Sequence, residues 1–303
     1  MPHAQANGLS LYYESHGDEA APTILLIMGL GAQMIAWPDA FRDRLVAGGH
    51  RVVLYDNRDV GLSEKLEAAG APDVPGILKA LGEGAKPPAA YTLDEMAADA
   101  VGLMDALGID QAHVVGASMG GMIAQLVAAD YPERVLTLTS IMSTTGNPDL
   151  PRSTPEAIAV LNNRGPDPRE DLEGYLAHSA NSAKVIGSPG YPPDPAVQRQ
   201  RAINTFQRAF YPMGFQRQYA GVMASPDRRP KLRTITAPTL VVHGEDDALV
   251  PVAGGRDTAA NIPGAALKTY PGMGHDLPAE LNHKIADAIL AHAAGAGARQ
   301  AAE

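Results

Sequence analysis

The chain has 303 residues, of which 45% are hydrophobic and 19% are charged, and its formal net charge is −10. This composition is that of a globular protein with a large core, and an acidic chain without clustered lysines and arginines argues against binding to nucleic acid or to an anionic membrane surface. Because the chain has no cysteine, disulfide bonds, thiolate metal sites and a cysteine nucleophile are excluded.

The N-terminal stretch MPHAQANGLSLYYES has no basic start followed by an apolar run, so it does not have the pattern of a signal peptide. The longest apolar run, TILLIMGLGA at 23–32, is too short to span a bilayer. We therefore expect a cytoplasmic protein with no membrane contact. The sequence is also compatible with a homodimer.

Short apolar runs alternate with helical patterns, which is typical of a mostly parallel sheet covered by helices. Residues 9–15 follow an Asn-Gly turn signal and are predicted to open the sheet as an antiparallel strand. Residues 23–28 and 51–56 are apolar nearly throughout, as strands buried on both faces must be. Between them, a helix is predicted from Pro38 to the glycine pair at 48–49.

The same alternation continues from residue 92. A capping box at Thr92–Glu95 predicts a helix that runs to about Leu107. The elements predicted after it are strands at 113–115, 135–141, 239–243 and 266–270, and helices at 119–129 and from Pro278 to about 293. The small-residue tail AAGAGARQAAE at 293–303 is expected to be disordered.

The alternation stops in residues 147–231, which are rich in proline and glycine. Helical patterns lie within this segment at 155–163, 169–181 and 195–210. Because the segment is too long for an ordinary loop, we expect a helical cap subdomain there. The rest of the chain, residues 1–146 and 232–303, is predicted to form the α/β core domain.

Two glycines flank a serine just after the predicted strand 113–115. Gly116-Ala117-Ser118-Met119-Gly120 matches the G-x-S-x-G pattern, with the strand before it and the helix after it that a nucleophile elbow requires. A plain small-residue turn is the alternative interpretation. An exposed hydroxyl needs a sharp turn, and glycine at 116 and 120 removes the clash between the flanking elements. The pattern predicts Ser118 as a nucleophile at a helix N-terminus, where the helix dipole favours a developing negative charge.

A serine nucleophile needs a base, and the base needs an orienting acid. In this architecture the chain order is serine, acid, histidine. His275 lies in the glycine-rich stretch YPGMGHDLP, directly after the last predicted strand, and is predicted as the base. Of the other histidines after Ser118, His243 is interpreted as a core residue, His283 and His292 as surface residues, and His178 is left open.

Three carboxylates compete for the role of the acid in HGEDDALVP: Glu245, Asp246 and Asp247. We predict Asp247, because it sits furthest into the turn and the acid must reach a buried imidazole while staying ionised. The other two are interpreted as solvated loop charges.

Acyl transfer also needs two donors for the oxyanion. One is the backbone N–H of Met119, the residue after the nucleophile, and the other is expected from the loop MGLGAQM at 28–34. Gly29 and Gly31 allow a tight approach there and leave the N–H of Leu30 free. An ordinary strand-to-helix turn would have a similar sequence.

Four motifs together resemble those of an α/β-hydrolase-fold serine hydrolase, over residues 7 to 295. DNRDVGLS at 56–63 is similar to the family's D-x-R-G-x-G-x-S turn, GASMGG to its nucleophile elbow, and GEDDALVP and PGMGHDLP to its acid and histidine loops. The resemblance implies an α/β fold with a mostly parallel eight-stranded sheet, helices on both faces and an inserted helical cap. It also places the acid at the fourth position of GEDD, which is Asp247.

Within this family, LLIMGLGAQMIAWPDAF at 25–41, together with YDNRDVGLS and PGMGH, is most similar to the aclacinomycin methylesterase branch, which cleaves a methyl ester on a polyketide. Two residues depart from the wider family pattern. Met28 stands where many relatives have histidine, and Asp59 replaces the usual glycine of the arginine turn. Both departures weaken the analogy to lipases.

The sequence thus predicts a carboxylic-ester hydrolase that acts on a small-molecule ester through an acyl-enzyme, with no cofactor and no metal. The alternatives are a C–C bond hydrolase acting on a β-diketone-like compound, a cofactor-free perhydrolase, and a non-catalytic ligand-binding module on the same fold.

An enclosed apolar pocket under the cap is expected to accept short or bulky cyclic esters. Its walls are expected to include the flexible side chains of Met28, Leu30 and Met119, as well as Phe206 and Phe215 from the cap. The predicted substrate contacts are Gly29, Met34, Phe210, Tyr211 and Met213. For each aromatic residue of the cap, packing in the cap's own core is the alternative interpretation.

Overall fold

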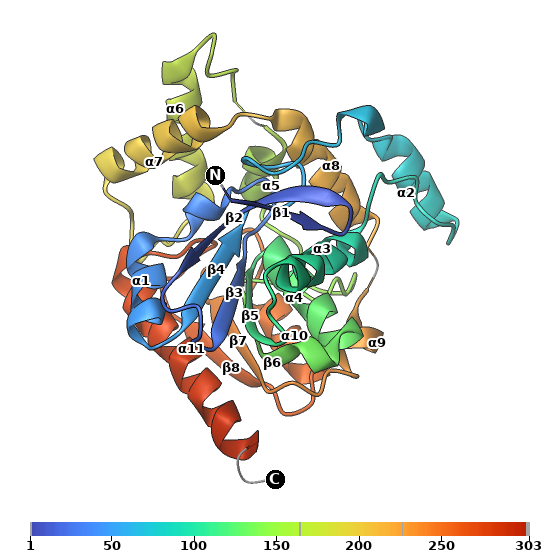
Figure 1. Ribbon diagram of the computed structural model, residues 1–303. Helices are drawn as coiled ribbons and strands as arrows, with labels where there is room; N and C mark the ends of the chain where they lie inside the picture. The colour runs from blue at the N-terminus through green and yellow to red at the C-terminus, as the bar shows by residue number, and fades with distance from the viewer. Residues whose placement is uncertain (1, 164, 226, 301–303) are drawn as a thin grey trace.

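A single twisted sheet runs through the computed structural model, which describes residues 2–163, 165–225 and 227–300 (Figure 1). The strand order is β1-β2-β4-β3-β5-β6-β7-β8. The β1–β2 and β2–β4 pairs are antiparallel, and all later pairs are parallel. The strands are β1 (His3–Ala6), β2 (Leu9–His16), β3 (Thr23–Ile27), β4 (Arg51–Tyr55), β5 (Ala112–Ala117), β6 (Val135–Ile141), β7 (Thr239–Gly244) and β8 (Ala266–Tyr270).

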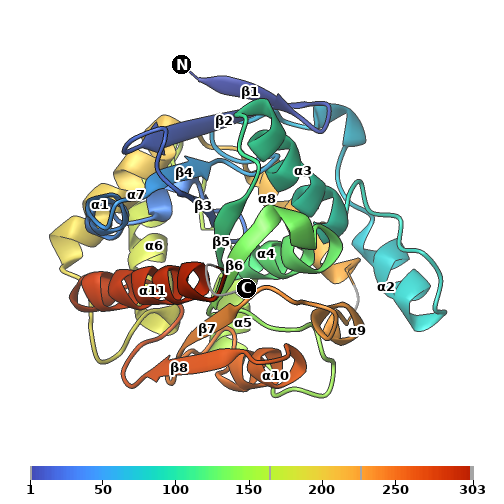
Figure 2. The same ribbon diagram turned by 60° about the horizontal axis from the view of Figure 1, so that its bottom comes forward.

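Helices cover both faces of the sheet, as Figure 2 shows. One face packs against α1 (Asp39–Ala47) and α11 (Ala279–Gln300), and the other against α3 (Leu93–Ala106) and α4 (Met119–Asp130). The short helix α2 (Val74–Gly82) follows β4, and α10 (Ala253–Asn261) connects β7 to β8. Alternate residues of a central strand enter different cores: Leu25 and Ile27 of β3 face α3 and α4, whereas Ile24 and Leu26 face α1 and α11. This explains why the central strands are apolar throughout.

The predicted strands and core helices are confirmed to within a few residues at each end. Three strands or α-helices of the core, β1, α2 and α10, were not predicted. The expectation of a disordered tail from residue 293 is wrong for the part that is described, because α11 continues to Gln300. Alanine is the strongest helix former, and the prediction gave too much weight to the glycines among the alanines. Residues 301–303 lie outside the described residues.

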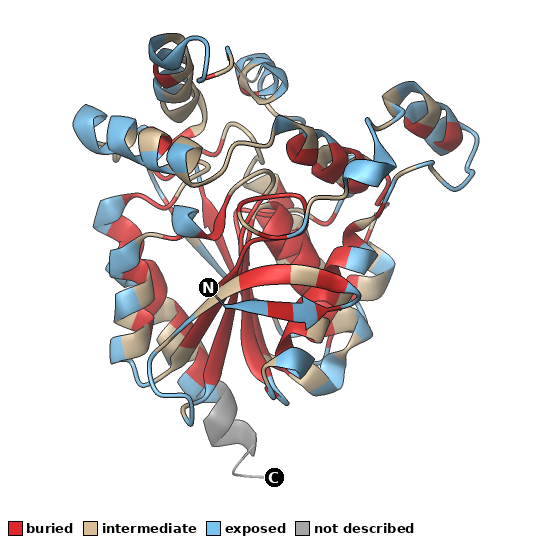
Figure 3. Cartoon of the chain, turned by 45° about the horizontal axis from the view of Figure 1, so that its top comes forward, coloured by how far each residue is buried: buried red, intermediate tan, exposed pale blue. Residues whose placement is uncertain are grey.

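The segment between β6 and β7 is helical, as predicted. It contains α5 (Pro155–Asn162), α6 (Leu172–Ile186), α7 (Pro195–Arg208), α8 (Pro212–Met223) and α9 (Arg229–Leu232). Helices α5 to α8 gather at one end of the sheet, at the top of Figure 1. Much of α6 and α7 is exposed or half-buried, whereas one side of α8 is buried (Figure 3). The helical pattern predicted at 195–210 matches α7, but α8 was not predicted.

A buried ion pair fixes α8 to the core. The Arg217 guanidinium donates to both carboxylate oxygens of Asp59, at 2.8 and 2.7 Å. Their side chains are 1% and 0% exposed, and the Tyr91 hydroxyl donates to the same carboxylate at 2.8 Å. Asp59 adopts a φ of +68°, which is the left-handed conformation that glycine adopts most easily. The aspartate that replaces the family's glycine therefore keeps the glycine-like turn and adds an anchor for α8.

Candidate active site

Ser118 lies between the end of β5 and the start of α4, on a sharp turn with a φ of +57°. The two flanking glycines are required by close packing. A Cβ on Gly116 would lie 2.0 Å from the carbonyl oxygen of Gly120, and a Cβ on Gly120 would lie 2.0 Å from the carbonyl oxygen of Ile27. These distances are far below any real contact, so the turn can form only with glycine at both positions. It presents the serine hydroxyl to a cavity at the end of the sheet.

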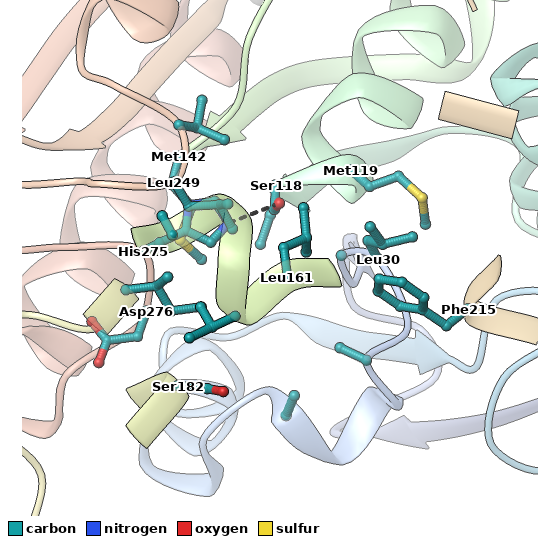
Figure 4. Close-up of a pocket in the computed structure, with 18 of the residues that line it drawn as sticks. Leu30, Ser118, Met119, Met142, Leu161, Ser182, Phe215, Leu249, His275 and Asp276 are labelled. Carbon is teal, nitrogen blue, oxygen red and sulfur yellow. Dashed lines mark hydrogen bonds between the residues drawn. The ribbon is translucent and has the colours of Figure 1, made fainter. Parts of the chain in front are cut away.

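A continuous hydrogen-bonded chain links this hydroxyl to a carboxylate. The Oγ atom of Ser118 lies 2.9 Å from Nε2 of His275, as the dashed line in Figure 4 marks. On the other side of the ring, Nδ1 of His275 lies 2.7 Å from Oδ2 of Asp247. Since an ionised carboxylate can only accept, Nδ1 carries the proton and Nε2 is free to accept the serine proton. The structure thus brings together the three residues that the sequence analysis selected.

Asp247 is held by the turn that follows β7. Its Oδ1 atom accepts hydrogen bonds from the backbone N–H groups of Leu249 and Val250, at 2.9 and 2.7 Å. Burial by itself would raise the pKa of this carboxyl, but the charge of His275 and the hydrogen bonds lower it to about 2. For His275, burial acts to lower the pKa, and the Asp247 carboxylate outweighs it and raises the pKa above its ordinary value. The pair therefore favours an ionised acid beside a more basic imidazole.

The two other carboxylates of this loop make different contacts. Both residues are exposed. Asp246 accepts a hydrogen bond from the N–H of Gly272 at 2.7 Å, and Glu245 accepts one from the Thr269 hydroxyl at 2.7 Å. The sequence analysis interpreted both carboxylates as solvated loop charges. They are exposed, but each also makes a specific hydrogen bond. Asp246 fastens the start of the histidine loop.

His243 is fully buried at the end of β7 and matches its interpretation as a core residue. Its Nε2 atom lies 2.8 Å from the carbonyl oxygen of Val250, and its Nδ1 atom has no hydrogen-bond partner. His178, which the sequence analysis left open, lines the cavity from α6. The imidazole that contacts Ser118 is that of His275.

The loop after β3 lies on the opposite side of Ser118 from His275. In Figure 4, Leu30 and Met119 lie across the serine from the imidazole. A Cβ on Gly29 would lie 3.0 Å from the Cβ of Ser118, so this loop approaches the serine as closely as glycine allows. The backbone of the loop and the start of α4 therefore flank Ser118 on the side away from His275.

Residues 186–190 of the segment between β6 and β7 hold the histidine loop, and nothing in the sequence pattern predicted this contact. The N–H of His275 donates to the carbonyl of Ile186 at 2.7 Å, and the N–H of Gly190 donates to the carbonyl of Gly272 at 2.9 Å. The Ser188 hydroxyl accepts a hydrogen bond from the N–H of Gly274 at 2.9 Å and donates to the Asp276 carboxylate. The backbone that carries His275 is therefore held by hydrogen bonds from this segment.

A cavity of about 620 Å³ opens beside Ser118 and His275. Its lining is mostly apolar and comes from both the core and the helical segment (Figure 4). Helix α8 contributes Phe215, Tyr219 and Val222, which are spaced to lie on one face of the helix. Helix α6 contributes a more polar set, which includes His178 and Ser182.

The predicted substrate contacts are only partly placed at this cavity. Gly29 lines it. Met34 is 1% exposed and packs in the core between the sheet, α1 and α11. Phe210 and Tyr211 line a separate depression of about 250 Å³, and Met213 lines neither. These four side chains do not line the cavity: Met34 is a core residue, and 212–223 forms a helix whose inward face presents Phe215, Tyr219 and Val222 to the cavity instead.

Two kinds of feature are absent from the described ranges 2–163, 165–225 and 227–300. Histidine and acidic side chains form no group of three or more that could hold a metal ion. No described helix combines the length and the apolar character needed to cross a bilayer.

Comparisons with known proteins agree with this architecture. The sequence profile of the α/β hydrolase fold family matches residues 22–280. Rhodomycin D methylesterase from Streptomyces peucetius is 30% identical to the chain, over 94% of this chain and 95% of the relative. A 2-hydroxy-6-oxononadienedioate/2-hydroxy-6-oxononatrienedioate hydrolase from Paraburkholderia phymatum is 29% identical, over 88% of this chain and 85% of the relative.

Among solved structures, a meta-cleavage product hydrolase from Pseudomonas fluorescens is similar with a TM-score of 0.74. The alignment covers 96% of this chain and 97% of that chain at 19% identity, so this likeness concerns the fold alone. The fold class predicted from the sequence is confirmed, and so is the resemblance to methylesterases.

Proposed function

The chain belongs to the α/β hydrolase fold family, and we propose that it is a carboxylic-ester hydrolase whose nucleophile is Ser118. His275 is the general base in this proposal, and Asp247 orients it. The observation that carries the proposal is the unbroken hydrogen-bonded chain from Ser118 through His275 to Asp247, at 2.9 and 2.7 Å. Its carboxylate has a lowered pKa and its imidazole a raised one, which is the pairing that general-base catalysis by histidine requires.

The reaction proceeds in two halves. Ser118 Oγ attacks the ester carbonyl carbon while His275 Nε2 takes the hydroxyl proton. The negative charge on the carbonyl oxygen is held by the N–H groups of Leu30 and Met119, which completes a tetrahedral intermediate. His275 then gives the proton to the leaving alcohol, and an acyl-enzyme remains on Ser118. A water molecule, deprotonated by His275, attacks the acyl carbon. The bond from this carbon to Ser118 Oγ then breaks, His275 returns the proton to Oγ, and the carboxylic acid is released.

The cavity supports esters of small or bulky apolar compounds as the substrate class. A volume of about 620 Å³ is within the range of sites for drug-sized ligands, and most of the lining residues are apolar, with methionine, leucine and alanine the most frequent among them. We propose that residues 147–231 act as a cap over this cavity. The similarity to rhodomycin D methylesterase supports a methyl ester as one such substrate.

A C–C bond hydrolase is the second candidate. It is favoured by the Paraburkholderia phymatum relative, whose substrates are dioates and so carry two carboxylates. The charges around the cavity favour the ester instead. Arg201 is the arginine of the described lining, which contains no lysine, and the Asp276 carboxylate also lines the cavity. One arginine set against one aspartate is poor compensation for a doubly charged substrate. The proposed perhydrolase and ligand-binding alternatives have no comparable observation in their favour.

An organophosphonate probe followed by peptide mass spectrometry tests the proposal. We expect the label on Ser118, and we expect Ser118→Ala to keep its fold while kcat for p-nitrophenyl acetate falls by about 10⁴-fold or more. Assaying the same preparations with a vinylogous 1,5-diketone separates ester from C–C bond cleavage. Labelling of another residue, with Ser118→Ala still active, would rule out the proposed mechanism.

A further inference from the structure

Gln218 on α8 is fully buried, and both ends of its side-chain amide are used. Its Oε1 atom accepts a hydrogen bond from the N–H of Gly31 at 2.8 Å. Its Nε2 atom donates to the carbonyl of Arg58 at 2.7 Å. Because one partner can only donate and the other can only accept, these contacts fix the orientation of the amide.

The first of these contacts falls on the loop that supplies the proposed oxyanion donor. Gly31 follows Leu30 directly and has a φ of +65°, and a Cβ on it would lie 2.5 Å from the ring of Phe215. Helix α8 therefore contacts the loop twice at this residue, through a ring and through an amide. A side chain larger than hydrogen has no room there.

Among the described residues, side-chain hydrogen bonds from the core reach the loop at its two ends. The side chain of Asn57 donates to the carbonyl of Met28 at 2.9 Å, and the N–H of Met34 donates to Asp56 at 2.8 Å. Between these points, the described side-chain hydrogen bond nearest to Leu30 is the one from Gly31 to Gln218. The N–H of Ala32 donates to the carbonyl of Gly29 at 3.2 Å, so Leu30 and Gly31 are the central residues of a turn. The peptide between Leu30 and Gly31 can rotate within such a turn, and its rotation would shift the backbone of Leu30 and with it the neighbouring peptide that carries the Leu30 N–H.

We propose that Gln218 is a positioning residue that sets the orientation of the Leu30 N–H in the oxyanion site. This inference rests on the proposed ester hydrolysis. Gln218 is not part of the described lining of the cavity, so it acts through the loop and not on the substrate. The cap then supplies part of the catalytic geometry in addition to the walls of the pocket.

Gln218→Met tests this role, because methionine has a similar size and can neither donate to Arg58 nor accept strongly from Gly31. Removing an oxyanion donor outright typically lowers kcat by about 10²- to 10³-fold, so a misplaced donor is expected to lower it by roughly 10- to 100-fold. The KM for p-nitrophenyl acetate should change little. The affinity for a trifluoromethyl ketone, which forms the tetrahedral adduct, should fall by about the same factor as kcat/KM.

Ser225→Ala is the matched control. Ser225 follows α8, and its hydroxyl accepts a hydrogen bond from the N–H of Leu93 at 2.9 Å, so it is also a buried side-chain acceptor for a core amide. It lies away from the oxyanion loop in sequence and in its contacts. We expect Ser225→Ala to lower the melting temperature without lowering kcat.

The outcomes separate the inference from the proposed function. If wild-type Ser118 is not labelled by the phosphonate, the proposed function fails. If it is labelled and Gln218→Met keeps the wild-type kcat and ketone affinity, or if Ser225→Ala loses as much kcat as Gln218→Met, only the positioning role is refuted. If Gln218→Met does not fold, Gln218→Glu takes its place, because it keeps an acceptor for Gly31. We expect Gln218→Glu to have a lower melting temperature and a nearly unchanged affinity for the ketone. A lost ketone affinity at an unchanged melting temperature also refutes the role.

Discussion

Replacing Asp247 with asparagine should change both the rate and the pH dependence of ester hydrolysis. The pKa of Asp247 is lowered from 3.8 to about 2, a difference of roughly 2.5 kcal/mol at about 1.4 kcal/mol per pH unit. The charge of His275 and its hydrogen bond to Asp247 stabilise the ionised carboxylate. The same interaction raises the pKa of His275. Without the carboxylate, burial becomes the dominant influence on His275 and lowers its pKa below the ordinary 6.5.

The asparagine amide would also face Nδ1 with a donor, which favours the ring tautomer whose Nε2 carries the proton. That tautomer cannot accept the Ser118 proton, so kcat should fall by about 10⁴-fold. Activity of the wild type should be lost on the acid side as His275 becomes protonated, with a midpoint above 6.5. In Asp247→Asn, the midpoint of the residual activity should move to lower pH.

Profiles of kcat/KM against pH with p-nitrophenyl acetate measure both effects. Asp246→Asn is the matched control: its carboxylate is exposed and contacts Gly272, so its effect on kcat should be small. A larger loss in Asp246→Asn than in Asp247→Asn would move the acid one residue upstream. If both variants stay active, the acid lies elsewhere, with Asp149 after β6 the next candidate. An unshifted acid limb in Asp247→Asn would refute the electrostatic reasoning.

Three further results are expected. Hydrolysis of p-nitrophenyl esters should fall steeply from acetate and butyrate to palmitate, because a cavity of about 620 Å³ limits acyl length; comparable rates on palmitate or on triolein emulsions would point to an open groove. EDTA should leave turnover unchanged, since the proposed mechanism uses side chains and backbone amides only, and a loss restored by zinc or manganese would contradict it. The Asp247 carboxylate should stabilise the fold above pH 3.8 and lose this contribution as the pH falls toward about 2, so acid unfolding of Asp247→Asn should show a weaker pH dependence in that range.

The residues that the sequence predicted best are those whose reasons are local. Gly116 is required by a contact with Gly120 inside the same turn, although Gly120 itself is required by the carbonyl of Ile27 on β3. Buried strands such as β6 are recognisable from their own apolar residues. The acid and histidine loops follow directly after β7 and β8, so their place at the sheet edge could be inferred once the strands were assigned. The comparisons confirm the fold that this reasoning predicted.

The residues that the sequence did not reveal depend on how α8 packs. Gly214 and Gly221 lower the helix propensity of this segment. Gly214 is required because a Cβ at this position would lie 1.9 Å from the carbonyl oxygen of Asp59. Because the sequence analysis did not predict α8, it assigned Phe210, Tyr211 and Met213 to the pocket wall. In the structure, Phe215, Tyr219 and Val222 of α8 line the cavity instead. Gln218 reads as an ordinary polar residue until its partners 187 and 160 positions away are known.

The ion pair between Asp59 and Arg217 also limits how this lineage can change. A single substitution at either position leaves the other charge buried and unpaired, which costs about 3–5 kcal/mol and is a large share of the stability of a typical domain. Replacement of Asp59 by glycine would ease the backbone at a φ of +68° and would still leave the Arg217 guanidinium buried without its counter-charge. The two positions are therefore coupled by epistasis. Related sequences with glycine at position 59 should carry an uncharged residue at position 217. The change from one pair to the other costs least when both positions change together.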